Sequence, residues 1–310
     1  MERRKFIKQT TTAAMLTSLL PAGALGRPRP PQGELKPYIC IFSKHLHWLG
    51  FVEMARLASE IGFTGIDLTV RKGGHVLPEN VKRDLPIAVE KIRAEGMEVP
   101  MITTEIIDSE DSLTRDILET AGKLGIGLYR PGWFSYKKGV PVADALSHAR
   151  KQMSQLQVIN QANHIAASYQ NHAGLSVGSS GWDLLKMIDG LDPRWTGVQF
   201  DIRHAMVEGP DTWPVFLEIL SPYINSLDIK DYTWEGSTVV NVPLGKGIVP
   251  FKAYLEELQK LKISAHFSIH YEYPLGGAER GEKELSIYKE QFVKSVQSDL
   301  QYFTNLYSHQ

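Results

Sequence analysis

The sequence predicts an α/β fold, a closed (β/α)8 or TIM barrel, and three observations lead to this prediction. Short apolar segments of strand length alternate with longer segments of helical periodicity, which is typical of a parallel sheet. Eight such units follow one another, and eight close a barrel. About 270 residues remain after an atypical N-terminal segment, a length that such barrels use as one domain.

The elements follow from hydrophobic periodicity. Apolar segments predict strands at residues 38–42, 65–71, 99–104, 127–130, 164–170, 198–202, 224–229 and 266–271. Helical periodicity predicts helices at residues 51–61, 85–95, 113–124, 142–161, 183–191, 213–221, 251–262 and 284–307. No change of composition large enough for a linker interrupts this series. We therefore expect one TIM-barrel domain over residues 38–310.

The N-terminal segment resembles an export signal. Arg3 and Arg4 precede a mainly uncharged stretch that ends in Ala22-Gly23-Ala24, a small-residue cleavage signal. The order Arg-Arg-x-Phe-Ile-Lys resembles the twin-arginine signal, and the stretch is too short and too weakly apolar to span a membrane. We expect a signal peptide at residues 1–24, a Pro-rich tether at 25–37, and a periplasmic protein without membrane attachment after cleavage. A merely basic leader is the alternative.

Charge and cysteine content narrow the classes of partner. The chain has 34 Lys and Arg against 35 Asp and Glu, a formal net charge of −1. Loss of residues 1–24 would remove four basic residues and one acidic residue and leave −4. This balance is too mild to indicate nucleic acid or a charged membrane as a partner. Cys40 is the only cysteine, which excludes an intrachain disulfide and a thiolate metal site.

The predicted strand at residues 198–202 ends in an unusual group of polar residues. Alternate positions of a strand share a face, so Gln199, Asp201 and Arg203 are expected to point together, with His204 in the loop that follows. Such a group at the C-terminal end of a barrel strand is where these folds place their chemistry. The alternative is a buried Asp201 satisfied by Arg203 and backbone amides.

Other predicted strands end in the same way. The last strand brings His270 and Glu272 to the same rim as Asp201. Oxygen and imidazole ligands from several strands suit a divalent cation such as Mg, Mn, Co or Zn, and a hydrogen-bonded network is the alternative. Side chains in neighbouring loops are candidates for contact with a substrate: Lys44, His47, Arg71, Arg130, Trp133, Asn171 and Arg203. Aromatic rings such as Trp133 suit the apolar faces of a sugar.

Several motifs together resemble the xylose-isomerase-like barrels of the sugar phosphate isomerase and epimerase superfamily. They are Asp201-x-x-His204, Lys230-Asp231, the segment Pro-Leu-Gly-Lys-Gly-Ile-Val at 243–249, and Gly-Phe-Thr-Gly-Ile-Asp at 62–67. The resemblance extends from about Tyr38 to the last helix. It implies a sugar as substrate and one divalent metal held at the ends of the last four strands.

The metal ligands that this resemblance implies differ here at two positions. Asp201 matches the family's Asp, and Glu272 best matches its last Glu. The Glu on the fifth strand is Gln170 here, and the His before the lysine of the seventh strand is Asp228. The expected metal set is Gln170, Asp201, Asp228, His270 and Glu272. Its oxygen-rich composition favours Mn, Mg or Co over Zn.

The loss of a carboxylate at position 170 affects the expected reaction. Gln170 cannot accept a proton, so Glu272 is the expected base, and the expected acid is one of His172, His204 and Lys230. These residues predict enediolate or carbanion chemistry on a free or oxidised keto-sugar, as in an isomerase or epimerase. A lyase or hydratase acting on a 3-keto-sugar or glycoside is one alternative, and a non-catalytic sugar-binding barrel is another. A homo-oligomer is left open.

Overall fold

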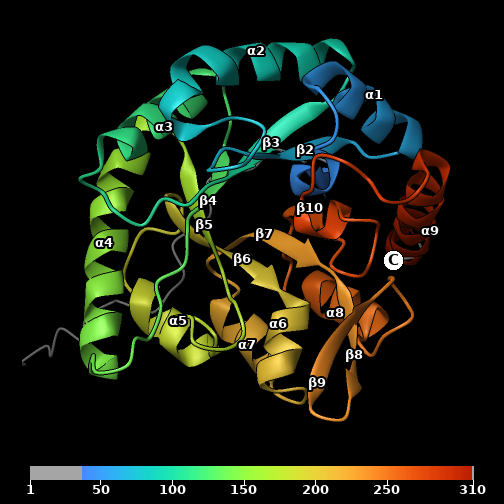
Figure 1. The fold of residues 1–310 in the computed structure, drawn as a ribbon. Helices are drawn as coiled ribbons and strands as arrows, with labels where there is room; N and C mark the ends of the chain where they lie inside the picture. Colours follow the sequence, from blue (N-terminus) through green and yellow to red (C-terminus); the bar gives the residue numbers. More distant parts are fainter. Residues whose placement is uncertain (1–36, 309–310) are drawn as a thin grey trace, which may run out of the picture. The chain divides into compact units, whose positions relative to one another are not determined.

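The computed structural model describes residues 37–308, which contain a closed barrel of eight parallel strands (Figure 1). Around the barrel the strands follow the order β1, β10, β7, β6, β5, β4, β3 and β2. Their bounds are β1 (Ile39–Phe42), β2 (Gly65–Thr69), β3 (Glu98–Thr103), β4 (Leu128–Arg130), β5 (Ala166–Gln170), β6 (Thr196–Asp201), β7 (Ile224–Ile229) and β10 (His266–Ile269). The predicted TIM-barrel fold is confirmed.

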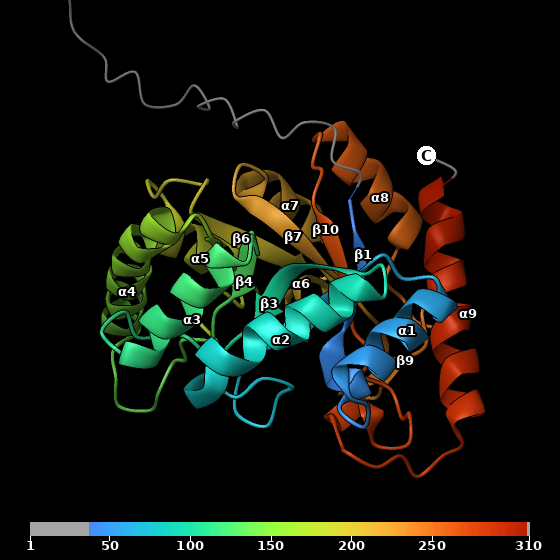
Figure 2. The ribbon, with the colours of Figure 1, turned by 90° about the horizontal axis from the view of Figure 1, so that it is seen from above.

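Helices connect successive strands and surround the barrel, as Figure 2 shows for α1, α2 and α3. The helices are α1 (Phe51–Ile61), α2 (Val81–Ala94), α3 (Ser112–Lys123), α4 (Val142–Asn163), α5 (Gly181–Ile188), α6 (Ile202–Glu208), α7 (Trp213–Leu220), α8 (Phe251–Lys260) and α9 (Lys289–Ser308). Local signals set their ends. Asp111 accepts the Leu113 N–H and caps α3, and Gly62, at φ +113°, ends α1 in a conformation that favours glycine.

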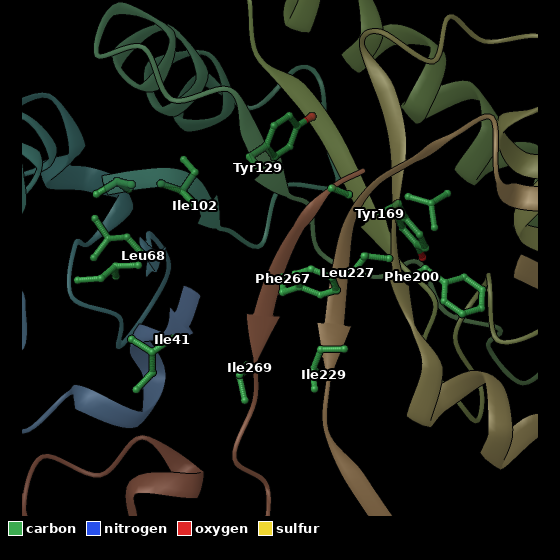
Figure 3. Packing of buried hydrophobic residues seen from close by; sticks show 14 of the residues in the cluster. Ile41, Leu68, Ile102, Tyr129, Tyr169, Phe200, Leu227, Ile229, Phe267 and Ile269 are labelled. Atoms are coloured by element: carbon green, nitrogen blue, oxygen red, sulfur yellow. The ribbon is translucent and has the colours of Figure 1, made fainter. Parts of the chain in front are cut away.

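The strands separate an apolar layer from a polar barrel interior. Apolar side chains of the strands pack beneath the helices, among them Ile41, Leu68, Ile102, Phe200 and Ile229 (Figure 3). Many residues of the other parity are polar although they are equally buried, as Gln199 and Asp201 are on either side of Phe200, while Cys40 and Phe42 of β1 are apolar exceptions. This alternation lets one strand contribute to the core and deliver a carboxylate to the interior.

Three local predictions were wrong. The strand expected at residues 198–202 ends at Asp201, and Ile202 begins α6, so Arg203 and His204 lie on a helix rather than on a strand and in a loop. After β7 the chain forms an antiparallel hairpin of β8 (Asp231–Glu235) and β9 (Thr238–Val242), which was not predicted. The last helix begins at Lys289 instead of residue 284.

The remaining predictions concern the N-terminal segment and membrane attachment. The predicted signal peptide and almost all of the tether lie outside the described residues. Within residues 37–308, none of the helices combines the length and the apolar character needed to cross a bilayer.

Candidate active site

Three neighbouring strands bring polar side chains together at one rim of the barrel. Gln170 ends β5, Asp201 ends β6, and Asp228 on β7 is paired in register with Asp201. At most 1% of the surface of each residue is exposed. The C-terminal ends of parallel strands meet at the same rim, so residues far apart in the sequence become neighbours here.

The amide of Gln170 has a fixed orientation. Arg130 Nη1 donates to Gln170 Oε1 at 2.9 Å, while Gln170 Nε2 donates to Asp201 Oδ2 at 2.8 Å and also to Asp228 Oδ2. Exchanging the two ends of the amide would turn its NH2 group toward a guanidinium, which can only donate. Gln170 therefore serves as a hydrogen-bond donor to two carboxylates.

Lys230 places a positive charge next to the same carboxylates. Its Nζ lies 2.9 Å from Asp201 Oδ2 and 3.8 Å from Asp228 Oδ2, and 5% of its side chain is exposed. Burial lowers the pKa of Lys230, but the two carboxylates outweigh this effect and raise it. Burial raises the pKa of Asp228 well above its usual range, against the opposing charge of Lys230. Buried charges need such partners, and Lys230 is the partner of Asp201.

Asp201 also organises the backbone where β6 becomes α6. Its Oδ1 accepts the His204 N–H at 2.9 Å and caps the helix. Asn171 holds Asp201 from both sides, because Asn171 Nδ2 donates to the Asp201 carbonyl at 2.9 Å and Asn171 Oδ1 accepts the Asp201 N–H at 2.7 Å. The spacing of Asp201 and His204 in the sequence is thus that of a helix cap.

His172 and His204 lie against each other with opposite tautomers. Their ring centroids are 4.0 Å apart. Arg203 Nη1 lies 3.0 Å from His204 Nδ1 and can only donate, which assigns the proton of neutral His204 to Nε2. His172 Nδ1 lies 2.9 Å from the Ala173 carbonyl oxygen, which can only accept, so His172 Nε2 carries the lone pair. Burial lowers the pKa of both rings and favours their neutral forms.

Glu272 is the partly accessible carboxylate of this rim. Its side chain is 32% exposed, and its Oε1 lies 3.4 Å from Lys44 Nζ. Burial raises the pKa of Glu272, but the charges of Lys230 and Lys44 outweigh this and lower it to about 2. His270 is buried, with Nε2 3.3 Å from Asp228 Oδ1, and burial lowers its pKa well below the usual range.

Phe42, the last residue of β1, has three cations around its ring. The charged groups of Lys44, Arg71 and Arg130 lie 5.6, 5.4 and 5.6 Å from its centroid, within the range of cation–π attraction. The same ring stacks on His270 at 4.3 Å. This role was not predicted, since a phenylalanine that ends a strand has no feature in the sequence to distinguish it from a core residue.

Trp133 and the hairpin complete this side of the rim. Arg130 lies 4.6 Å from the Trp133 ring, which is 4.7 Å from the ring of His172. From α6, Arg203 Nη2 donates to Asn241 Oδ1 at 2.7 Å, so the hairpin strand β9 positions the guanidinium that faces His204. Asn241 was also missed, because the hairpin itself was not predicted.

His47 belongs to a different cluster. Its Nε2 lies 3.1 Å from Thr69 Oγ1, its Nδ1 lies 3.1 Å from the Gly281 carbonyl oxygen, and its ring packs edge-on against His75. With His75, Phe51 and Lys283 it lines a cavity of about 220 Å³. The structure therefore gives His47 protein partners outside the group around Asp201.

The arrangement of the five predicted ligands does not fit a divalent metal. Gln170 presents its NH2 group to the carboxylates, and the Lys230 ammonium contacts the same oxygen of Asp201. No group of three or more His, Cys, Asp or Glu within residues 37–308 is arranged to hold a metal ion. A hard cation needs several oxygen ligands, and here two donors already engage Oδ2 of Asp201 and Oδ2 of Asp228, which leaves Asp228 Oδ1 as the carboxylate oxygen without a hydrogen-bond partner. The predicted metal site is not confirmed.

Asp231 gives a structural reason for two of the sequence motifs. Its carboxylate accepts backbone N–H groups of Tyr232, Gly245, Gly247 and Val249 at 2.8 to 3.1 Å. A Cβ on Gly247 would lie 2.2 Å from Asp231 Oδ1, so only glycine fits there. The aspartate beside Lys230 and the segment 243–249 thus hold each other in place.

Fold and geometry define a TIM-barrel protein with a charged site at the C-terminal rim of its strands, where such barrels carry their active sites. Residues 55–291 match the family described as xylose isomerase-like TIM barrel. The chain belongs to this family, as its motifs indicated. No curated protein sequence matches it.

Solved structures share the fold at low sequence identity. A D-tagatose 3-epimerase-like protein has a TM-score of 0.65 and 16% identity, over 88% of this chain and 98% of its own. D-psicose 3-epimerase from Clostridium cellulolyticum H10 has a TM-score of 0.66 and 11% identity, over 87% and 99%. A probable 3-DHS dehydratase from Bacillus anthracis has a TM-score of 0.63 and 15% identity, over 86% and 98%. At these identities the likeness shows the fold alone.

Proposed function

We propose that this protein is an enzyme that acts on a free or oxidised keto-sugar by removing a proton from the carbon next to a carbonyl group. The observation that carries the proposal is a partly exposed, ionised carboxylate, Glu272, held beside the fixed charges of Lys44 and Lys230. A base next to cations suits a reaction that builds negative charge on an oxygen. The solved 3-epimerases of this fold support a sugar as the substrate.

Glu272 would take the proton. Its pKa of about 2 leaves it ionised at any ordinary pH but makes it a weak base. The reaction therefore depends on stabilising the enediolate that forms. The electron pair of the C–H bond forms a C=C bond, the carbonyl electrons move onto oxygen, and that oxygen lies within the field of the rim cations.

The two histidines provide groups for the second proton transfer. His204 presents N–H at Nε2 and would donate to a substrate oxygen, whereas His172 presents a lone pair at Nε2 and would accept a proton. In an isomerase, Glu272 alone would return the proton to the neighbouring carbon. In an epimerase, a second group must act from the opposite face, and His172 on the β5 side of the rim is the candidate that replaces the carboxylate absent at Gln170.

Two alternatives follow from specific observations. Elimination on a 3-keto-sugar or glycoside begins with the same proton removal, hydration ends with the reverse proton transfer to that carbon, and a probable dehydratase shares the fold. A sugar-binding barrel without chemistry remains an alternative because Gln170 and Asp228 differ from the ligands that the family resemblance implies.

The test is turnover of a small panel of sugars. Purified protein is incubated with D-tagatose, D-psicose, D-fructose and 3-keto-glucosides, and products are separated by chromatography. Glu272→Gln should lower the rate by about 10²- to 10⁴-fold, while Glu284→Gln, the same change at an exposed position, should leave it unchanged. Equal activity of wild type and Glu272→Gln would contradict the role of Glu272, and a folded protein that binds these sugars without converting them would indicate the binding barrel.

A further inference from the structure

The rim of the barrel balances its charges with its own side chains. Four of its carboxyl groups interact with four cationic side chains that lie among them. The carboxyl groups belong to Asp67, Asp201, Asp228 and Glu272, and the cations are Lys44, Arg71, Arg130 and Lys230. No excess of negative charge remains in this group to attract a divalent cation.

The space between Asp201 and Asp228 is taken by two hydrogen-bond donors. Gln170 Nε2 donates to both carboxylates, in an orientation that Arg130 fixes. Lys230 Nζ is within 3.8 Å of both, and it also acts electrostatically on Glu272. Lys230 therefore contacts the buried carboxylates and acts through its charge on the accessible one that we propose as the base.

We propose that the ammonium group of Lys230 is the resident cation of this site, in place of a divalent metal, and that it holds the substrate oxygen that becomes negative. The second half of this inference, that Lys230 holds the substrate oxygen, rests on the proposed function. The first half, that Lys230 takes the place of a metal, concerns ion binding and is independent of that function.

The step balances without a further reactant. Glu272 accepts the proton from the carbon next to the carbonyl, the C–H electron pair becomes a C=C bond, and the carbonyl π pair moves to oxygen. The Lys230 ammonium keeps its protons and stabilises this oxygen by charge and hydrogen bonding. The reverse flow returns the proton to carbon. No electrons leave the substrate, and no oxidant or reductant is needed.

The first experiment measures metal binding by the full-length protein. Protein purified with Mn²⁺ in every buffer should contain far less than one metal ion per chain by elemental analysis. EDTA should leave the melting temperature unchanged, and calorimetric titration with Mn²⁺ should show only weak binding. One tightly held ion per chain, or a melting temperature that EDTA lowers, would overturn the inference whatever the enzymatic activity.

The second experiment converts the site. The double variant Gln170→Glu with Lys230→Met replaces both donors by one carboxylate and one neutral side chain of similar length. Its affinity for Mn²⁺ should exceed that of the wild type by about 100-fold or more, since affinity for hard cations follows the number of charged oxygen ligands. Its melting temperature should rise with Mn²⁺. Failure of a folded double variant to gain affinity would contradict the inference.

Controls separate the two halves of the proposal. Lys246→Met makes the same change at an exposed position and should not alter Mn²⁺ affinity. Asp201→Asn with Lys230→Met removes both members of the closest ion pair, and Gln170 still donates to Asp228, so it should fold even if Lys230→Met does not, and its turnover should fall by about 10²-fold or more. Wild-type turnover that requires added metal would leave the proposed function intact and overturn this inference.

Discussion

At the scale of single residues, the chemistry of the site depends on which side-chain atoms face one another. The convergence of Gln170, Asp201 and Asp228 was predicted, because barrel topology brings the strand ends to one rim and the family resemblance pointed to positions 170 and 228. The sequence did not predict that Gln170 would present its nitrogen, since Arg130 on another strand determines that orientation. Contacts between side chains remote in the sequence depend on packing that no local pattern encodes.

The first prediction concerns Gln170→Glu. A carboxylate in place of the amide would add a third acidic group next to Asp201 and Asp228, with Lys230 as the one remaining donor between those two, and like charges at a buried site oppose one another. We expect a loss of roughly 2 to 4 kcal/mol in the free energy of unfolding at pH 7. The loss should shrink toward pH 5, because a carboxyl group with a raised pKa is neutral in the folded protein at low pH and becomes destabilising as pH rises.

Chemical denaturation at the two pH values measures this effect. Gln301→Glu on the exposed side of α9 is the matched control and should change stability little. If Gln170→Glu is as stable as the wild type at pH 7, the described network of donors around the carboxylates is wrong.

At the scale of elements, hydrophobic periodicity predicted the eight barrel strands and most helices, but not the segments between them. Asp201 ends β6 and caps α6, so the alternating pattern continues in the sequence for one residue beyond the strand. The hairpin had a recognisable signal, Gly236-Ser237 between a segment with two aromatic residues and a β-branched segment. It was overlooked because a strand followed directly by a loop and a helix was expected there.

The hairpin leads to the second prediction. Asn241→Ala removes the acceptor that holds Arg203 Nη2, so the guanidinium facing His204 loses one anchor. We expect weaker substrate binding, with a rise in KM of about 10-fold or more, because loss of a hydrogen bond to a charged group costs roughly 1.5 to 3 kcal/mol and about 1.4 kcal/mol corresponds to tenfold. Ser237→Ala at the exposed hairpin turn should change neither KM nor kcat. A larger effect of Ser237→Ala than of Asn241→Ala would contradict this role.

The third prediction uses the contact between α9 and the barrel. Burial raises the pKa of Asp299 to about 6, although Tyr273 OH donates to its carboxylate at 2.9 Å. A carboxyl group whose pKa is higher in the folded state stabilises the fold when protonated. That contribution is complete below about pH 4 and is lost as pH rises through about 6.

Unfolding free energies between pH 4 and pH 7 test this expectation. Asp299 should account for a decrease of roughly 1 to 3 kcal/mol over that range. Asp299→Asn keeps the shape of the side chain and cannot ionise, so this share of the pH dependence should disappear. An unchanged pH profile in Asp299→Asn would show that Asp299 titrates normally.

At the scale of the whole molecule, the fold was predictable from the sequence, and the charge balance of the barrel rim was not. The fold and family followed from repeated patterns and motifs, which are local and occur many times along the chain. The charge balance of the rim was not predictable, because its members come from distant strands and loops. A list of ligand-type residues at strand ends suggested a metal site, whereas the geometry showed an ammonium and an amide among them.

The fourth prediction concerns export. If residues 1–24 act as a twin-arginine signal, the mature chain should begin near Leu25 and reach the periplasm. Replacing Arg3 and Arg4 by lysine should leave precursor in the cytoplasm, which immunoblots of cell fractions would detect. Replacing Lys5 and Lys8 by arginine keeps the charge and the arginine pair and is the control. Unchanged export of the first variant would indicate the general secretory route.

The central claim, that Glu272 removes a proton next to a carbonyl group, is tested most directly by reaction in heavy water. Product and recovered substrate are analysed by NMR for deuterium at the carbons beside the carbonyl. We predict deuterium at one such carbon with the wild-type protein, and a decrease of about 10²-fold or more in its rate of incorporation in Glu272→Gln. Deuterium incorporation that survives Glu272→Gln in full, or turnover by Glu272→Gln at the wild-type rate, would contradict the account.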